Sequence, residues 1–315
     1  MLENYETNKQ ETSPEVQEDS VNLVRERRFR PRTVFVPLLF GLIFVLIQVL
    51  GVTLVAGLRY GSEIIESQGL ETGIDMTKYM MDPLVTSLAT IFMALILIPL
   101  FVYYIFRRRK MYPMTYLQER LGAQKFMTAA SAIILGLAGT QLLILGLHGL
   151  GQLSPYVAER LEYHEKLMQT ILPSNDHFFL SFLSVVILVP IMEELLCRGI
   201  IMGEFLQAMK PAFAALCAAL IFALFHGNFV QIAYVIVPGL ILSFAYYLSG
   251  HLLVPIVMHM IFNFLGGFLP TYMGANLTDA NAERYGLILL LLYALSAFYL
   301  LFLFIRRRRQ TRVVS

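Results

Sequence analysis

The stretch from Phe178 to Gln207, FFLSFLSVVILVPIMEELLCRGIIMGEFLQ, decides the fold of this chain. It is apolar over a length that would cross a bilayer, yet it contains two adjacent glutamates, Glu193 and Glu194, and an arginine, Arg198. An ionisable side chain at the centre of a membrane helix costs about 2.5–3.5 kcal/mol on insertion scales, so such residues mark functional sites by default. The stretch therefore predicts a membrane helix with chemistry inside it.

Two further polar clusters follow in a region, residues 211–278, that contains no lysine, arginine, aspartate or glutamate. They read Phe222-Ala-Leu-Phe-His226 and His259-Met-Ile-Phe-Asn263. The composition of the whole chain agrees with a membrane protein, because 57% of its residues are hydrophobic and only 15% are charged. A water-soluble globular protein usually has about 25% charged residues, so that class is excluded.

Uncharged runs, compared with a hydrocarbon core about 30 Å thick, predict an all-α, polytopic membrane bundle of about eight transmembrane helices. The predicted helices are Thr33–Leu58, Pro83–Phe106, Phe126–Leu150, Phe178–Gln207, Ala212–His226, Phe229–Ser249, Leu252–Phe268 and Gly286–Ile305. The chain then divides into a disordered, acidic cytoplasmic tail (1–32), N-terminal transmembrane helices (33–150), a transmembrane core with the three polar clusters (178–268), and a last helix with a basic tail (286–315).

The basic residues predict the orientation of this bundle. They gather before the first helix (Arg25 to Arg32), after the second (Arg107 to Lys110), after the charged part of the fourth (Arg198, Lys210) and after the last (Arg306 to Arg309). The alternate loops, 59–81, 151–177 and 269–284, contain mostly acidic charges. By the positive-inside rule both termini are cytoplasmic, and the number of crossings is even. The absence of sorting signals fits a multi-pass protein of a bacterial plasma membrane.

Helix geometry brings the first two clusters to one depth. If the fourth and fifth helices form an antiparallel hairpin that turns at Lys210-Pro211, Glu193 lies 17 residues before the turn and His226 lies 16 after it. At about 1.5 Å per residue the two side chains are then at about the same depth. A carboxylate that faces an imidazole in a low-dielectric wall is suited to general-base activation of water.

The i, i+4 spacing places other pairs on one helix face. His259 and Asn263 form such a pair, which could polarise a scissile carbonyl and hold the oxyanion that forms. Glu194 and Arg198 form another, so we expect an ion pair between them that leaves Glu193 as the freer carboxylate.

Purely structural roles remain open for the same residues. A membrane histidine can bond a neighbouring backbone carbonyl, and polar contacts between membrane helices are common and worth about 0.6 kcal/mol. The two glutamates could also extend to water together with Arg198. Three clusters at helical spacing in an otherwise apolar region nevertheless favour a site.

Taken in order, Glu193-Glu194-x-x-x-Arg198-Gly199, Phe222-x-x-x-His226 and His259-x-x-x-Asn263 resemble the motifs of the CAAX protease and bacteriocin-processing family. These proteins are membrane-embedded endopeptidases related to the type II CAAX prenyl endopeptidase. The resemblance covers roughly residues 178–268. The family commonly has an aromatic residue before the arginine, where this chain has Cys197.

The resemblance implies an intramembrane protease. Glu193 would be the catalytic base that activates water, His226 would help to bind that water, and His259 with Asn263 would form the oxyanion site. Glu194 and Arg198 would support the architecture. No cofactor is certain: zinc is an alternative, held by Glu193, His226 and His259, although the chain has no His-Glu-x-x-His motif.

The implied substrate is a membrane-associated peptide or protein in contact with the lipid bilayer, with no nucleic-acid partner and no indicated oligomeric state. Two other classes stay open. One is a non-catalytic membrane adaptor, which would regulate a sensor kinase or confer bacteriocin immunity. The other is a secondary transporter, which is disfavoured because the Glu-Glu-x-x-x-Arg motif has no second copy.

Overall fold

The structure, a computed structural model, describes residues 27–68, 79–108, 122–171, 177–276 and 279–313. Every regular element within these ranges is helical, which confirms the predicted all-α class. The predicted cytoplasmic tail lies outside the described residues up to residue 26, and helix α1 already begins at Pro31.

Seven helices in the described ranges are long and apolar enough to cross a membrane, so the protein is a polytopic membrane bundle. Three π-helical segments, labelled η, interrupt these helices. The elements are α1 (Pro31–Gln68), α3 (Pro83–Arg107), α4 (Ala123–Gly151), α5 (Pro155–Ile171), α6 (Phe178–Ser181), η4 (Phe182–Leu188), α7 (Val189–Glu194), η5 (Leu195–Met202), α8 (Gly203–Phe205), α9 (Pro211–Leu224), α10 (Phe229–Ser249), α11 (Leu253–Asn263), η6 (Phe264–Phe268), α12 (Leu269–Asn276) and α13 (Asp279–Val313).

Some segments differ from the predicted boundaries. The predicted span Ala212–His226 is helix α9, whose 14 residues reach only about 21 Å, less than the thickness of the hydrocarbon core. The predicted loops 151–177 and 269–284 contain helix α5 and helix α12 with the start of α13. Hydropathy does not detect α5, because its apolar residues alternate with charged ones at a helical period.

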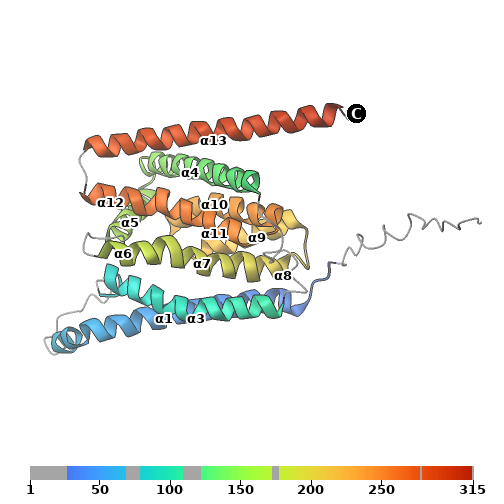
Figure 1. The fold of residues 1–315 in the computed structure, drawn as a ribbon. Coiled ribbons are helices and arrows are strands. Elements are labelled where there is room, and N and C mark those ends of the chain that lie inside the picture. Colours follow the sequence, from blue (N-terminus) through green and yellow to red (C-terminus); the bar gives the residue numbers. More distant parts are fainter. Residues whose placement is uncertain (1–26, 69–78, 109–121, 172–176, 277–278, 314–315) are drawn as a thin grey trace, which may run out of the picture.

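The helices lie roughly parallel to one another (Figure 1). Helices α1 and α3 pack together on one flank, α13 packs against α4 on the other, and α10 and α11 lie between them. Many large apolar side chains of α1 and α13 are exposed, as expected of helices that face lipid. The beginning of α1 and the end of α13 lie at the same end of the bundle, so the short helix α9 acts as a partial crossing beside the seven long helices of the described ranges.

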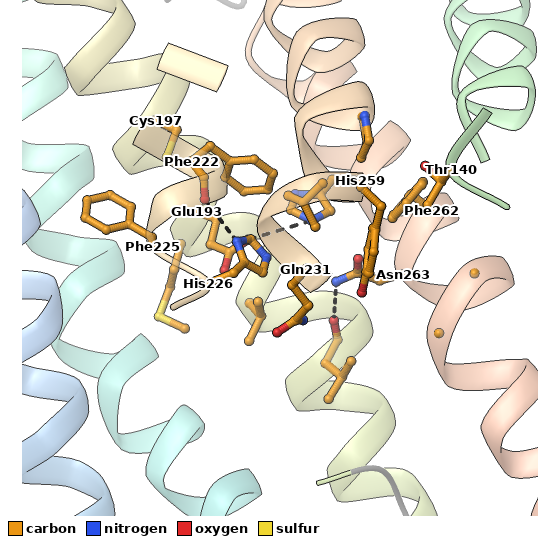
Figure 2. A pocket seen from close by; sticks show the side chains of 18 of the residues that line it. Thr140, Glu193, Cys197, Phe222, Phe225, His226, Gln231, His259, Phe262 and Asn263 are labelled. Atoms are coloured by element: carbon orange, nitrogen blue, oxygen red, sulfur yellow. Dashed lines mark hydrogen bonds and ion pairs between the residues drawn. The ribbon is translucent and has the colours of Figure 1, made fainter. Parts of the chain in front are cut away.

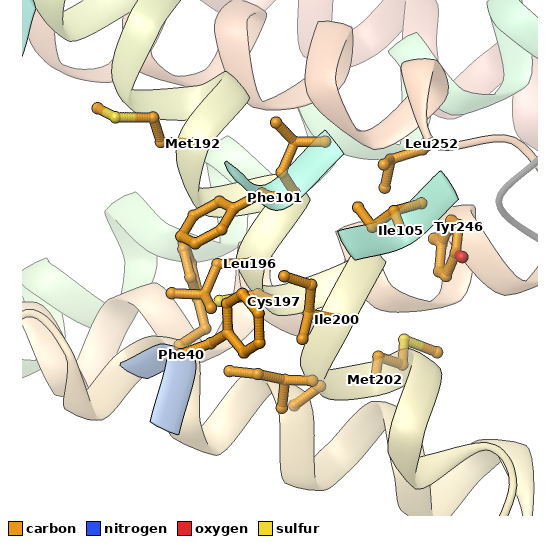
Figure 3. Close-up of a cluster of buried hydrophobic side chains, with 14 of the residues drawn as sticks. Phe40, Phe101, Ile105, Met192, Leu196, Cys197, Ile200, Met202, Tyr246 and Leu252 are labelled. Atoms are coloured by element: carbon orange, nitrogen blue, oxygen red, sulfur yellow. The ribbon is translucent and has the colours of Figure 1, made fainter. Parts of the chain in front are cut away.

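The largest buried cluster joins α3 and η5 to α1 and α10 (Figure 3). A glycine permits this packing, because a Cβ on Gly199 would lie 2.5 Å from Cδ1 of Ile105 on α3. Gly199 directly follows Arg198, so α3 packs closely against the part of η5 that carries this buried arginine.

The buried carboxylate of Glu204 contacts residues at the ends of two other helices. Glu204 of α8 is fully buried, and it lies 3.4 Å from Arg32 Nε and 3.3 Å from Arg108 Nη2. The hydroxyl of Tyr104 also donates to it at 3.2 Å. In the sequence, Arg32 and Arg108 serve to predict the membrane orientation. In the structure, both also form ion pairs with Glu204.

Candidate active site

A cavity of about 420 Å³ lies inside the bundle, and helices from most of the described chain line it. Four of the predicted site residues reach it: Glu193, His226, His259 and Asn263 (Figure 2). The two remaining ones, Glu194 and Arg198, are fully buried behind the cavity wall. The structure therefore brings all six residues to one place, in two layers.

The adjacent glutamates have different surroundings because α7 turns by about 100° per residue. The side chain of Glu193 is 20% exposed and faces the cavity, whereas that of Glu194 is 0% exposed. This agrees with the prediction that Glu193 is the freer carboxylate.

Glu194 has two partners on the same oxygen. Arg198 Nη1 donates to its Oε1 at 2.7 Å, which confirms the predicted ion pair, and His259 Nδ1 lies 2.8 Å from the same atom. An ionised carboxylate can only accept, so Nδ1 of His259 must carry the proton of this bond. The contact with His259 is a role of Glu194 that the sequence does not predict.

Arg198 is fixed by two further contacts. Its Nη2 donates to the backbone carbonyl of Gly239 on α10 at 2.8 Å, and its guanidinium lies 4.7 Å from the ring centroid of Phe222. A buried cation needs such partners, because burial removes it from bulk water. Arg198 therefore joins η5, α9 and α10 around Glu194.

The ring nitrogen of His259 that is not bound to Glu194 faces the cavity. Its Nε2 lies 3.7 Å from Glu193 Oε2, which is too long for a direct hydrogen bond. A relay of side chains thus runs from Arg198 through Glu194 and His259 toward Glu193. The first two members are at the i, i+4 spacing, but His259 lies 65 residues away from Glu194.

His226 bonds its own helix. Its Nδ1 lies 2.9 Å from the carbonyl oxygen of Phe222, which can only accept, so Nδ1 donates and Nε2 is left as an acceptor. No hydrogen bond or ion pair joins His226 to Glu193 within the described residues, although both line the cavity. Glu193 and His226, which we expect to face each other, therefore line the same cavity without a direct bond between them.

Phe222 lies between the two histidines. Its ring makes edge contacts with His226 at 5.1 Å and with His259 at 5.5 Å between centroids (Figure 2). The sequence includes Phe222 in a motif without giving it a role. Its place beside both imidazoles and Arg198 makes it the apolar centre of the site.

Asn263, the last residue of α11, donates a hydrogen bond to a backbone carbonyl of η4 that lacks a donor within its own helix. Its Nδ2 donates to the carbonyl oxygen of Val185 in η4 at 3.0 Å. In this π-helical segment the N–H of Val189 bonds Ser184, and the next residue, Pro190, has no N–H to offer. Val185 is thereby left without these backbone donors, and the amide of Asn263 supplies one.

The residues that zinc would need do not converge. Among the described side chains, no group of three or more His, Cys, Asp and Glu has the geometry to hold a metal ion. The Nδ1 bonds of His259 to Glu194 and of His226 to Phe222 leave both Nε2 atoms free, so the lack of a converging set of ligands, and not these bonds, argues against a metal. We therefore derive no step through a metal.

Cys197, where the family commonly has an aromatic residue, is buried among the apolar side chains of the main core and also borders the cavity. Cys217 is only partly buried. Both are free thiols, and the surroundings of Cys197 give its side chain a packing role.

Comparison with known proteins matches the segment that builds this site. The family model described as type II CAAX prenyl endopeptidase Rce1-like matches residues 175–265. The membrane-embedded CAAX protease MroQ of Staphylococcus aureus (strain USA300) is 37% identical over 105 residues, which are 31% of this chain and 41% of that protein. The match thus spans about two fifths of the length of this relative. No solved structure matches the chain.

The matched segment contains all three motifs, from Glu193 to Asn263, and the structure gathers them around one cavity. This segment is similar to the type II CAAX prenyl endopeptidases, which supports the family resemblance that the three motifs indicate.

Proposed function

We propose that this protein is an intramembrane endopeptidase that hydrolyses a peptide bond of a membrane-associated peptide or protein. The observation that carries the proposal is the position of Glu193. Its carboxylate faces the cavity 3.7 Å from Nε2 of His259, whose other nitrogen is held by the buried Glu194. A base beside an oriented imidazole, inside an apolar cavity, suits water activation.

In this mechanism, Glu193 takes a proton from a water molecule, and the hydroxide oxygen attacks the scissile carbonyl carbon. With its proton on Nδ1, His259 presents Nε2 as an acceptor for the same water. Nε2 of His226, left free by the bond to Phe222, provides another polar contact in the cavity. The C–N bond then breaks, and Glu193 returns the proton to the leaving amine.

Asn263 provides the hydrogen-bond donor of the oxyanion site. One N–H of its amide is bound to Val185, and the amide has a second N–H for the developing negative charge. His259 would join as a donor only with a second proton, on Nε2, so its support for the oxyanion is secondary to its contact with water.

The proposal is tested by comparing membrane peptidomes of cells that express wild type or Glu193→Gln at matched levels. We expect peptide termini that occur with wild type and are lost in the variant. Identical peptidomes, together with an unchanged cellular phenotype, would favour the adaptor function instead.

Asn263→Ala should lower kcat by about 10²–10³-fold, because one preorganised oxyanion donor is worth roughly 3–4 kcal/mol. It should also lower stability by about 1–3 kcal/mol, because the Val185 carbonyl loses its donor. Purified enzyme in nanodiscs would provide both numbers.

A second substitution separates these two effects. Pro190→Ala restores an N–H five residues after Val185, in the π-helical register, so Asn263→Ala/Pro190→Ala should recover stability without recovering kcat. Recovery of both would remove Asn263 from the chemistry.

The metal-free mechanism makes its own prediction. Dialysis against a strong zinc chelator should leave turnover unchanged, because Glu193 activates water without a Lewis acid. Near-stoichiometric zinc by elemental analysis, lost together with activity in His226→Ala or His259→Ala, would show a metalloprotease instead.

We also propose that both termini are cytoplasmic, on the strength of the one-sided arginine clusters. In a variant without the two native cysteines, Ser154→Cys between α4 and α5 should react with an impermeant maleimide from outside the cell only. Lys210→Cys, at the opposite end of the bundle, is the matched control and should be protected. The reverse pattern would invert the orientation.

A further inference from the structure

Helix α9 ends inside the bundle, and the cavity lies beyond its end. Phe225, the first residue after α9, packs against α1, where its ring stacks on Phe44 at 6.3 Å and lies 3.0 Å from the Cβ position of Gly41. Gln48 is one helical turn further along α1 than Phe44, and it lines the cavity. Past the end of α9, the face of α1 that Phe225 contacts therefore borders the cavity instead of α9.

A second glutamine lies at a similar depth on another helix. Both α1 and α4 begin at the same end of the bundle (Figure 1), and Gln48 is the 18th residue of α1 while Gln141 is the 19th residue of α4. Both side chains line the cavity and both are exposed. Neither forms a hydrogen bond with the side chains or backbone that the structure describes.

These two amides differ from the two threonines that also line the cavity. The hydroxyl of Thr90 donates to the Thr86 carbonyl, and that of Thr140 donates to the Gly136 carbonyl, so each is satisfied by its own helix. An amide at membrane depth without a partner is costly. Each glutamine presents both a C=O acceptor and an NH₂ donor, the groups that complement a peptide backbone.

We propose that Gln48 and Gln141 bind the backbone of an unwound segment of the substrate. The reason for a peptide to enter the cavity rests on the proposed proteolytic function. A membrane helix satisfies its backbone internally, and unwinding it for attack by Glu193 exposes N–H and C=O groups that need new partners at membrane depth. The glutamines provide these bonds in the space that α9 leaves open, and they make the protein selective for segments that unwind readily.

Binding can be tested without cleavage. The probe pair consists of two Leu/Ala-rich peptides of about 24 residues, one with a central Gly-Pro-Gly-Ser and one that is helical throughout. Full-length Glu193→Gln protein is placed in nanodiscs of phosphatidylethanolamine and phosphatidylglycerol, and energy transfer from labelled protein to labelled peptide reports the Kd. The same measurement follows in Gln48→Leu/Gln141→Leu, with Leu46→Ala/Leu142→Ala as the control, since both leucines are exposed and neither borders the cavity.

We expect the unwound probe to bind more tightly than the helical one. The double glutamine variant should raise the Kd of the unwound probe by about 10–100-fold, because two hydrogen bonds are lost, and should not change that of the helical probe. The control should match the parent protein. In otherwise wild-type enzyme, the glutamine substitutions should raise KM and leave kcat unchanged.

Two results would overturn the inference: no preference for the unwound probe, or a preference that survives loss of both glutamines. Cleavage of the unwound probe by wild type is scored separately. Glutamine-dependent binding without cleavage would count against the proposed protease and leave the binding role of the glutamines intact.

Discussion

Glu193→Gln should abolish peptide-bond cleavage while the protein remains folded. The amide is nearly isosteric with the carboxylate, but it cannot take a proton from water. Loss of about 3–5 kcal/mol of transition-state stabilisation corresponds to a rate about 10²–10⁴-fold lower. Turnover of a peptide identified in the peptidome comparison, measured with purified enzyme in nanodiscs, provides the rate.

The fold should tolerate this change because Glu193 faces the cavity. Its side chain is 20% exposed, and the nearest ionisable group, Nε2 of His259, is 3.7 Å away. The melting temperature of Glu193→Gln should therefore match that of wild type. Full turnover in a correctly folded variant would falsify the role of Glu193 as base and strengthen the adaptor interpretation.

The same substitution one residue later should destabilise the protein. Glu194→Gln leaves the guanidinium of Arg198 fully buried beside a neutral amide, and breaking a buried ion pair on one side typically costs about 3–5 kcal/mol. We expect a lower melting temperature and earlier unfolding in a denaturant titration. Activity should fall as well, because Nδ1 of His259 loses its charged acceptor.

Replacing both Glu194 and Arg198 separates the effect of the ion pair on stability from its effect on catalysis. Glu194→Gln/Arg198→Met removes the uncompensated cation, so it should regain much of the stability that Glu194→Gln loses. It should stay inactive, because the carboxylate that orients His259 is still missing. A double variant as unstable as Glu194→Gln would show that Arg198 acts mainly through Gly239 and Phe222.

Much of the fold follows from local sequence. Long apolar runs predict the membrane-spanning helices because a helix of about 20 apolar residues matches the thickness of the bilayer. The turn at Lys210-Pro211 also follows, since proline suits the first turn of a helix, and α9 begins at Pro211. Helix α5 is different: it has too many charges for a hydropathy criterion, and its position against α4 and α10 depends on the assembled bundle.

The ion pair of Glu194 with Arg198 and the shared face of His259 and Asn263 are determined by the sequence alone, because residues four apart on a helix are always neighbours. Contacts between helices are not determined in this way. The bond of His259 to Glu194 and that of Asn263 to Val185 join residues 65 and 78 positions apart. They require each helix to be rotated correctly about its axis.

The π-helical segments control that rotation. Each extra residue in a turn shifts the following side chains by about 100° around the helix, and η4 and η5 lie directly before and after the segment that carries Glu193 and Glu194. Residue types and spacing alone therefore identify the polar groups of the site. Only tertiary packing, which selects the π-helical register and ends α9 inside the bundle, decides that one glutamate faces a cavity while its neighbour is buried against an arginine and a histidine.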